Sequence, residues 1–177
     1  DLSRLADIAE EVTIHTGDLA DASTLRPVFA AARPDRVVHL SATTRPLGKG
    51  SMLEDTKCAL SDVSDLINVL SAAEDAVRPP ALFMRAGTLA EYGKGPHPYA
   101  ETQREQPTTP CAAGIISATH FADVLQHQLS FPVISARLAL VYGPGQSSKF
   151  LIPQLIENCR SNLTTHVRYP DERRDLI

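Results

Sequence analysis

The sequence predicts an α/β protein built on a parallel sheet. Short runs rich in β-branched residues alternate with longer stretches whose apolar residues recur at helical spacing. A hydrophobic content of 43% and a charged content of 21% are typical of a soluble globular protein, and 177 residues are enough for one ordinary domain. Strands that alternate with helices favour a parallel sheet that is covered by helices on both faces.

The first half of the chain contains two predicted strands and two predicted helices. A short strand is expected over residues 12–15 (VTIH) and a second, buried strand over residues 37–40 (VVHL). Asp21 or Ser23 is suited to cap the helix between them, because both side chains accept hydrogen bonds from the first helical N–H groups. A long helix is expected over residues 52–77, where Leu and Val recur every three or four positions.

The second half continues the same alternation and adds one long loop. We expect a strand over residues 81–86 and a loop rich in Gly, Pro and Thr over residues 87–110. A helix over 112–129 and a strand over 132–140 follow. A helix over 150–160 and a last short strand over 165–168 complete the pattern. Loops of more than about 15 residues inside a compact domain are usually functional. Ligands of open parallel sheets bind at the carboxyl ends of the strands. The expected ligand-binding edge therefore comprises Asp18 and residues 41–44, 87–88 and 141–143.

Five short motifs follow or contain these strands. They are GDLAD (17–21), VVHLSA (37–42), RAGTLAEYG (85–93), RLALVYGPG (137–145) and RRDLI (173–177). Their order and spacing resemble the extended short-chain dehydrogenase/reductase family, the NAD-dependent epimerases and dehydratases that modify nucleotide sugars, whose corresponding motifs include VxHLAA, SSxxVYG and RDFxxV. The resemblance implies a Rossmann-like, doubly wound parallel sheet and a nucleoside-diphosphate sugar as substrate. AEYG and the following PTTP are similar to bacterial enzymes for 4-keto-6-deoxy sugars.

The resemblance also implies NAD or NADP as cofactor and assigns residues to it. Asp18 is expected to accept a hydrogen bond from the adenine amino group, and Leu19 to pack on the adenine ring. The other cofactor-binding candidates are Leu40, Ser41, Ala42, Ala86 and Val141. The substrate-binding candidates are Thr88, Arg137, Tyr142 and Arg174, and the two guanidinium groups match the geometry of phosphate oxygens. Ion pairs within the protein are an equal alternative for both arginines.

Two of the three catalytic positions that the resemblance implies hold unexpected residues. Thr88 matches the Ser or Thr that orients a substrate oxygen. In the family a tyrosine acts as general acid/base, and a lysine four residues later lowers the tyrosine pKa, which is ordinarily about 10. Cys111 stands at the tyrosine position and Ile115 at the lysine position. A thiol at a helix N-terminus favours the thiolate, but no His or Asn is paired with it in sequence, so Cys111 is interpreted as a small replacement.

Two functions therefore stay open from the sequence alone. The first is an NAD(P)-dependent epimerase, dehydratase or reductase that has diverged at the tyrosine and lysine positions. The second is a catalytically inactive relative that binds nucleotide or a protein partner. Alteration of these two positions in an otherwise active scaffold is a third possibility.

The motifs also predict how the chain is divided. Residues 1–160 are expected to form a partial dinucleotide-binding domain, and residues 161–177 the start of the substrate-binding region. The family's first strand and its glycine-rich GxxGxxG loop are not found in these 177 residues. The simplest interpretation is a part of a longer protein, and the alternative is a natural fragment.

Charge and cysteine content predict which partners to expect. A net charge of −4 and a pI near 5.8 give no reason to expect nucleic acid or an anionic membrane. The three cysteines are odd in number and lack metal-ligand spacing, so we expect no metal and a reduced, cytoplasmic setting. Family members pair two helices per subunit across a dimer, which here implies residues 52–77 and 112–129.

Overall fold

The computed structural model describes residues 3–41, 51–167, 171 and 175–177. The chain divides into two compact units. One unit comprises residues 15–138, and the other joins residues 1–14 to residues 139–177.

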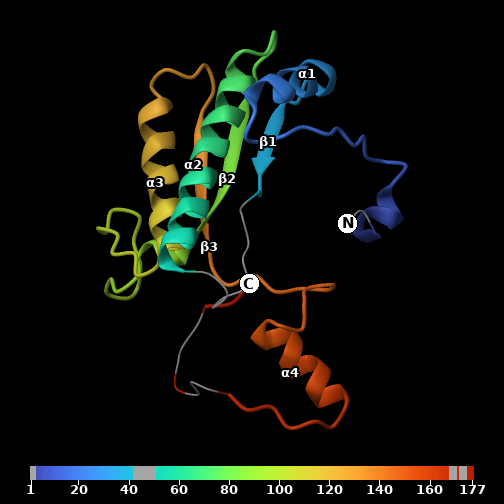
Figure 1. The fold of residues 1–177 in the computed structure, drawn as a ribbon, viewed down its shortest axis with the longest axis vertical. Coiled ribbons are helices and arrows are strands. Elements are labelled where there is room, and N and C mark those ends of the chain that lie inside the picture. Colours follow the sequence, from blue (N-terminus) through green and yellow to red (C-terminus); the bar gives the residue numbers. More distant parts are fainter. Residues whose placement is uncertain (1–2, 42–50, 168–170, 172–174) are drawn as a thin grey trace. The chain divides into compact units, whose positions relative to one another are not determined.

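The larger unit is organised around a parallel sheet of three strands in the described residues (Figure 1). The strands are β1 (Arg36–His39), β2 (Leu82–Thr88) and β3 (Val133–Leu138), in the order β1-β2-β3. Val38 lies beside Met84 in the β1–β2 register. Each neighbouring pair is parallel, which confirms the predicted sheet type.

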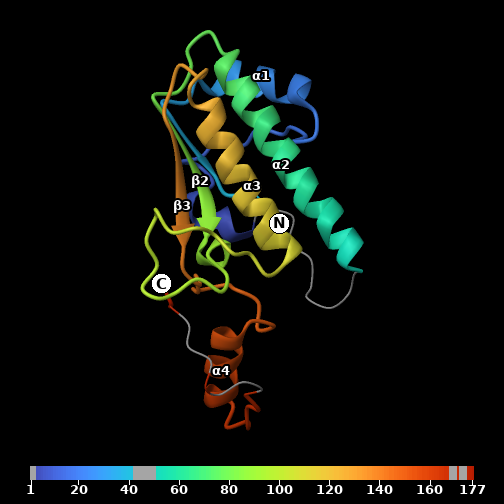
Figure 2. The same ribbon diagram turned by 90° about the vertical axis from the view of Figure 1, so that its left-hand side faces the viewer.

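Helix α1 (Ala22–Ala32) precedes β1, and the next two helices, α2 (Met52–Glu74) and α3 (Pro110–Leu125), connect the strands of this unit. Helices α2 and α3 run side by side along one face of the sheet, and α1 packs beside α2 (Figures 1 and 2). The alternation of helix and strand that the sequence predicted is confirmed here, with boundaries shifted by a few residues.

Each of these helices begins at a side-chain cap. The Asp21 carboxylate accepts from the Ser23 N–H at 2.8 Å, as predicted for α1. Ser51 and Glu54 form a reciprocal capping box at α2, and the Thr109 hydroxyl accepts from the first turn of α3. Caps of this kind contribute about 1 kcal/mol each.

The core of the larger unit lies between the sheet and its helices. Phe83 on β2 is fully buried and lies between the rings of His39 and Phe131. The surrounding buried residues are Leu25, Phe29, Val63, Leu66, Val69, Leu70, Ala72, Ala73, Ala118 and Ala122. Burial of a Phe or Leu side chain contributes about 1.5–3 kcal/mol, so this layer holds the helices against the sheet.

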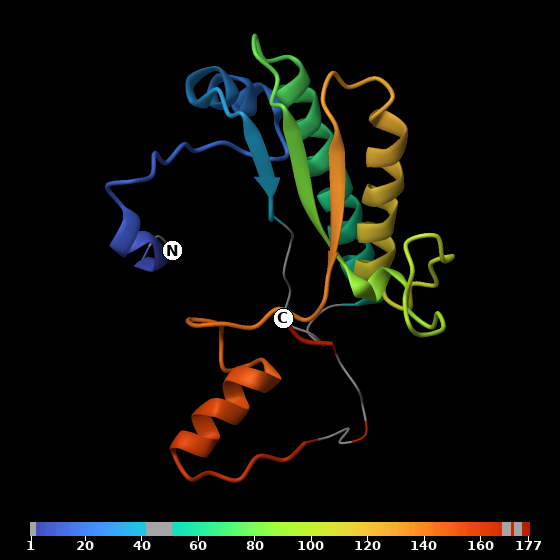
Figure 3. The ribbon, with the colours of Figure 1, turned by 180° about the vertical axis from the view of Figure 1, so that it is seen from behind.

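The second face of the sheet carries apolar side chains that are exposed to solvent. Val38 and Ile134 are 54% and 49% exposed. Figure 3 shows the strands from this side, with α2 and α3 behind them. The sequence predicted helices on both faces of the sheet. In the described residues of this unit, the helices cover one face only.

The smaller unit contains η1 (Ser3–Ile8) and α4 (Leu151–Arg160), and α4 confirms the helix predicted over residues 150–160. A parallel bridge joins Leu140 to Leu176. In the described part of the chain, no helix combines the length and the apolar character that a membrane crossing requires.

Two predicted strands are wrong. Residues 12–15 and the described residues 165–167 adopt no strand, and residue 168 lies outside the described residues. Both runs contain β-branched residues, but a strand also needs a neighbour that pairs with its N–H and C=O groups. Ile14 is 54% exposed, so burial does not favour an extended pairing there either.

The close packing of α2 on α3 gives a first prediction. A Cβ atom at Gly114 would lie 2.5 Å from the Ala59 Cβ and 3.0 Å from its Cα and carbonyl oxygen. Gly114→Val is expected to lower the free energy of unfolding by about 1–3 kcal/mol, because the helices must separate. Urea denaturation measures the loss, and Ala113→Val, one residue earlier and only half-buried, is the control. Equal losses in both variants would contradict this interpretation.

Candidate functional site

Thr88 ends β2 and starts the 3-10 turn η2 (Leu89–Glu91). Its N–H donates to Glu91 Oε1 at 2.9 Å, and its hydroxyl oxygen accepts from the Ala90 N–H at 3.2 Å. This reciprocal cap holds the side chain at the carboxyl end of the strand. Since the hydroxyl oxygen accepts locally, its hydrogen is left to donate, which suits the predicted role of orienting a substrate oxygen.

Glu91 is the most deeply buried acidic side chain near Thr88, with none of its surface exposed. Besides the Thr88 N–H, its carboxylate accepts from the Thr119 hydroxyl at 3.1 Å and from Arg137 Nε at 3.0 Å. A buried carboxylate is tolerated only when it is paired and hydrogen-bonded, and Glu91 meets both conditions.

Arg137, on β3, forms the ion pair that balances Glu91. Its other nitrogens donate to Glu105 Oε1 at 2.8 Å and to the Tyr92 hydroxyl at 2.7 Å. The guanidinium carbon also lies 4.7 Å from the centre of the Tyr92 ring. Burial acts to lower the pKa of Arg137, but the bonds to Tyr92 and Glu91 outweigh it and hold the pKa above its usual range. Internal ion pairs are therefore present at Arg137, and its predicted contact with substrate stays a prediction.

A second buried arginine extends this network toward α3. Arg85 donates to the Thr119 hydroxyl at 2.7 Å, to Ser135 Oγ at 3.3 Å and to the Ile115 carbonyl at 3.4 Å. Burial lowers the pKa of Arg85, and the charge of Glu91 opposes that shift. Arg85, Thr119 and Glu91 were not among the site residues predicted from the sequence. Only Glu91 could have been noticed in the sequence, because a charged residue stands there at the position where the motif SSxxVYG has valine.

Cys111 and Ile115 lie in the first turns of α3, four residues apart. Cys111 is exposed as a residue, but partial burial of the thiol, together with the negative charges of Asp62 and Asp55, raises the pKa of the thiol. Ile115 is half-buried and has no charge. The two positions therefore supply neither an acid/base with a pKa near neutrality nor a cation, and the raised pKa disfavours a thiolate nucleophile.

The raised thiol pKa predicts slow alkylation. At pH 7 the thiolate is the nucleophile, so Cys111 should react with iodoacetamide more slowly than a free cysteine. Asp62→Asn removes a negative charge and is expected to lower the pKa and speed the reaction. The rate against pH, followed by mass spectrometry with Cys58 and Cys159 changed to serine, measures both effects. Reaction faster than free cysteine would contradict the shift.

The predicted cofactor residues of the larger unit occupy two places: three lie on or just after β1 and β2, whereas Asp18 and Leu19 precede α1 in a segment that is not a strand. Asp18 is exposed, and its Oδ1 accepts from the Ala20 N–H at 3.0 Å, which leaves the second carboxylate oxygen to accept from a ligand. Leu19 packs against the core, and its carbonyl accepts from Asn68 at 2.9 Å. Leu40 and Ser41 follow β1 and are exposed, and half-buried Ala86 lies on β2. An exposed carboxylate with exposed apolar surface fits the adenine and ribose of a dinucleotide.

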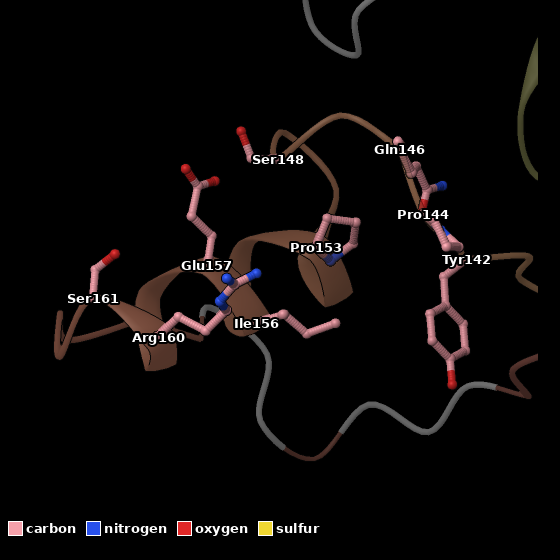
Figure 4. A pocket seen from close by; sticks show the side chains of 11 residues that line it. Tyr142, Pro144, Gln146, Ser148, Pro153, Ile156, Glu157, Arg160 and Ser161 are labelled. Carbon is pink, nitrogen blue, oxygen red and sulfur yellow. The ribbon is translucent and has the colours of Figure 1, made fainter. Parts of the chain in front are cut away.

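Val141 and Tyr142 belong to the smaller unit, and Ala42 and Arg174 lie outside the described residues. Tyr142 lines a pocket of about 780 Å³ within this unit. Figure 4 shows Tyr142, Pro144 and Gln146 at one side of the pocket and Glu157, Arg160 and Ser161 at the other. The pocket brings an aromatic ring and the guanidinium of Arg160 together. The assignment of Tyr142 to the substrate stays a prediction.

Comparison with known families decides the class of protein. The family model described as "NAD dependent epimerase/dehydratase family" matches residues 2–177. The chain belongs to this family. The predicted membership, which was based on five short motifs, is thus confirmed.

Curated relatives from this family include dTDP-glucose 4,6-dehydratases. The protein of Shigella flexneri is 26% identical over 175 residues, covering 89% of this chain and 48% of its own length. That of Neisseria gonorrhoeae is 29% identical over 170 residues, with shares of 90% and 49%. The human protein is 28% identical over 147 residues, with shares of 82% and 41%. The chain therefore spans about half the length of these relatives.

Solved structures show the same fold. A UDP-N-acetylglucosamine 4-epimerase from Methanobrevibacter ruminantium, in complex with UDP-N-acetylmuramic acid, superposes with a TM-score of 0.85 at 22% identity, covering all of this chain and 57% of its own. A dTDP-glucose 4,6-dehydratase double mutant from Streptomyces venezuelae, with NAD bound, gives a TM-score of 0.79 at 21% identity, with shares of 99% and 53%. The Rossmann-like fold class is confirmed.

Proposed function

We propose that the protein to which this chain belongs binds NAD(P) and a nucleoside-diphosphate sugar as a divergent epimerase, dehydratase or reductase. The observation that carries the proposal is Thr88 at the end of β2, in a chain of this family: its hydroxyl oxygen accepts from the Ala90 N–H, which leaves the hydroxyl hydrogen to donate to a ligand. Cys111 and Ile115 mark the divergence.

The cofactor would be held mainly by the carboxyl ends of β1 and β2. Asp18 and Leu19 would contact the adenine, and Leu40, Ser41 and Ala86 would line the path of the ribose and pyrophosphate. When bound, NAD(P) supplies a hydride acceptor or donor. The names of the relatives support a nucleotide sugar as substrate, since they act on dTDP-glucose or UDP sugars.

The second candidate is an inactive relative that binds nucleotide without turnover. The raised pKa of Cys111 and the uncharged side chain of Ile115 favour it, because general acid/base catalysis requires a group that titrates near the working pH. Both candidates share the cofactor site, so binding and turnover separate them.

The test is calorimetry of the full-length protein with NADH and NADPH, followed by turnover assays on dTDP-glucose and UDP-glucose. Binding with turnover supports the divergent enzyme. Binding without turnover on either sugar supports the inactive relative. Absence of binding to both cofactors contradicts the two candidates together.

We also propose that the full-length protein is a cytoplasmic homodimer that pairs α2 and α3 with a second copy, without nucleic acid or membrane partners. Large apolar side chains are exposed on these helices, including Leu60, Ile67, Phe121 and Val124. Exposed apolar patches often mark interaction surfaces. Light scattering after size-exclusion chromatography gives the mass, and Ile67→Lys with Phe121→Lys should yield monomers.

A further inference from the structure

Thr88 depends for its position on a residue outside the family's catalytic set. Its N–H donates to Glu91 Oε1 at 2.9 Å, and the same carboxylate is held from the other side by Thr119 and Arg137. We propose that Glu91 is a positioning residue for Thr88 in ligand binding. This inference rests on the proposed function, in which Thr88 contacts the sugar nucleotide.

The three donors to Glu91 come from three different parts of the larger unit. Thr88 ends β2, Thr119 lies on α3 and Arg137 on β3. Hydrogen bonds from two neighbouring strands and a helix hold the carboxylate in one position. The Thr88 backbone, bonded to that carboxylate, is therefore fixed relative to both β3 and α3.

Gly87 supports this interpretation independently. A Cβ atom at residue 87 would lie 2.5 Å from Glu91 Oε1, so the carboxylate occupies the space that a side chain at residue 87 would need. In the resembling motif SSxxVYG a serine and a valine stand at these two positions. This chain has Gly87 and Glu91 there, and the two residues fit one another in space.

The arrangement also determines what Thr88 can offer to a ligand. Its hydroxyl oxygen accepts from the Ala90 N–H, within the same turn that Glu91 closes. The hydroxyl hydrogen is therefore available to an acceptor outside the turn. Thr88 also pairs with Leu138 in the sheet, so loss of the Glu91 contact would free the Thr88 N–H and loosen the turn that orients the hydroxyl.

The experiment measures dTDP-glucose and UDP-glucose binding to the NAD-loaded full-length protein by calorimetry. Glu91→Gln is the main variant, because Thr88 and Arg137 donate to different oxygens of the carboxylate and the amide replaces one of these oxygens with an NH₂ group, which can only donate. Glu105→Gln is the matched control, since Glu105 bonds the same Arg137 but not Thr88. Glu91→Gln is expected to weaken binding about tenfold, and Glu105→Gln less than twofold.

A double-mutant cycle with Thr88→Val separates positioning from a general structural role. If Glu91 acts through Thr88, Glu91→Gln has no further effect on affinity once the hydroxyl is absent. Gly87→Ala provides a second route, because the added methyl group displaces the carboxylate without removing it, and it should reproduce the loss even if Glu91→Gln folds poorly.

The outcomes are distinct. Unchanged affinity in both Glu91→Gln and Gly87→Ala, or additive losses in the cycle, would overturn the positioning role and leave the proposed function intact. A parent protein that binds neither sugar nucleotide would overturn the proposed function, and with it the ligand-directed role of Thr88 and Glu91.

Discussion

Replacing Cys111 with tyrosine and Ile115 with lysine is expected to raise turnover of a nucleotide sugar by about 10²–10⁴-fold, the usual contribution of a positioned general acid/base. The phenol would supply the proton-transfer group that the thiol does not. The lysine would lower the tyrosine pKa from its ordinary value near 10 toward the working pH.

The geometry of α3 favours this gain. Residues 111 and 115 are one helical turn apart in the first turns of α3, so the new side chains would be neighbours on one face. The exposed position of Cys111 leaves space for a larger ring.

The measurement is kcat for dTDP-glucose with NAD in the full-length protein. The matched control is Cys111→Phe with Ile115→Met, which reproduces the size of the new side chains without the phenol or the ammonium group. A rise in the control equal to that in the Tyr–Lys variant would show that packing, not proton transfer, limits the parent. Full activity in the parent would show that another residue performs the acid/base step.

Glu91→Leu is expected to lower the free energy of unfolding by about 3–5 kcal/mol, the usual loss when one partner of a buried ion pair is removed. The Arg137 side chain is only 14% exposed and Glu91 is fully buried, so water does not replace the lost carboxylate. Glu105 still pairs with Arg137, and the Thr119 hydroxyl can still donate to the Ile115 carbonyl at 3.2 Å, but the Thr88 N–H and Arg137 Nε lose their acceptor.

Urea denaturation of the full-length protein measures this loss. Asp35→Asn is the control, since its ion pair with Arg78 is short at 2.6 Å but about 70% exposed on both sides. Such surface pairs contribute about 0–1 kcal/mol. A loss below about 1 kcal/mol in Glu91→Leu would contradict the buried-pair interpretation, and the double change Glu91→Leu with Arg137→Met should recover part of the stability.

The sequence was sufficient for the order of strands and helices because periodicity and caps are local signals. Apolar spacing predicts α2, and of the two caps that the sequence offers for α1, Asp21 and Ser23, the structure uses Asp21. Pairing is not local. The run over residues 12–15 has strand-forming composition, yet it adopts no strand, since composition does not report whether a neighbour is present.

The candidate site divides in the same way. The catalytic positions Thr88, Cys111 and Ile115 were assigned from motif order, because Thr88 belongs to the RAGTLAEYG motif and the other two begin the next predicted helix. The role of Glu91 depends on partners 28 and 46 positions away, at Thr119 and Arg137. A glutamate or an arginine in a sequence is expected at the surface, so the burial of Glu91 and Arg85 was visible only in three dimensions.

Arg137 has a consequence for how the segment between Glu91 and Glu105 can vary. One guanidinium bonds both carboxylates, which stand at the two ends of this segment. The Lys94 backbone N–H also donates to the Gln106 carbonyl, so the two ends of the segment are joined a second time. Inside the segment, the Tyr99 ring stacks on the Tyr92 ring with centroids 4.7 Å apart, and Tyr92 bonds the same guanidinium. New sequence in this segment should therefore be tolerated while Tyr99 is kept, and it can vary without moving Thr88.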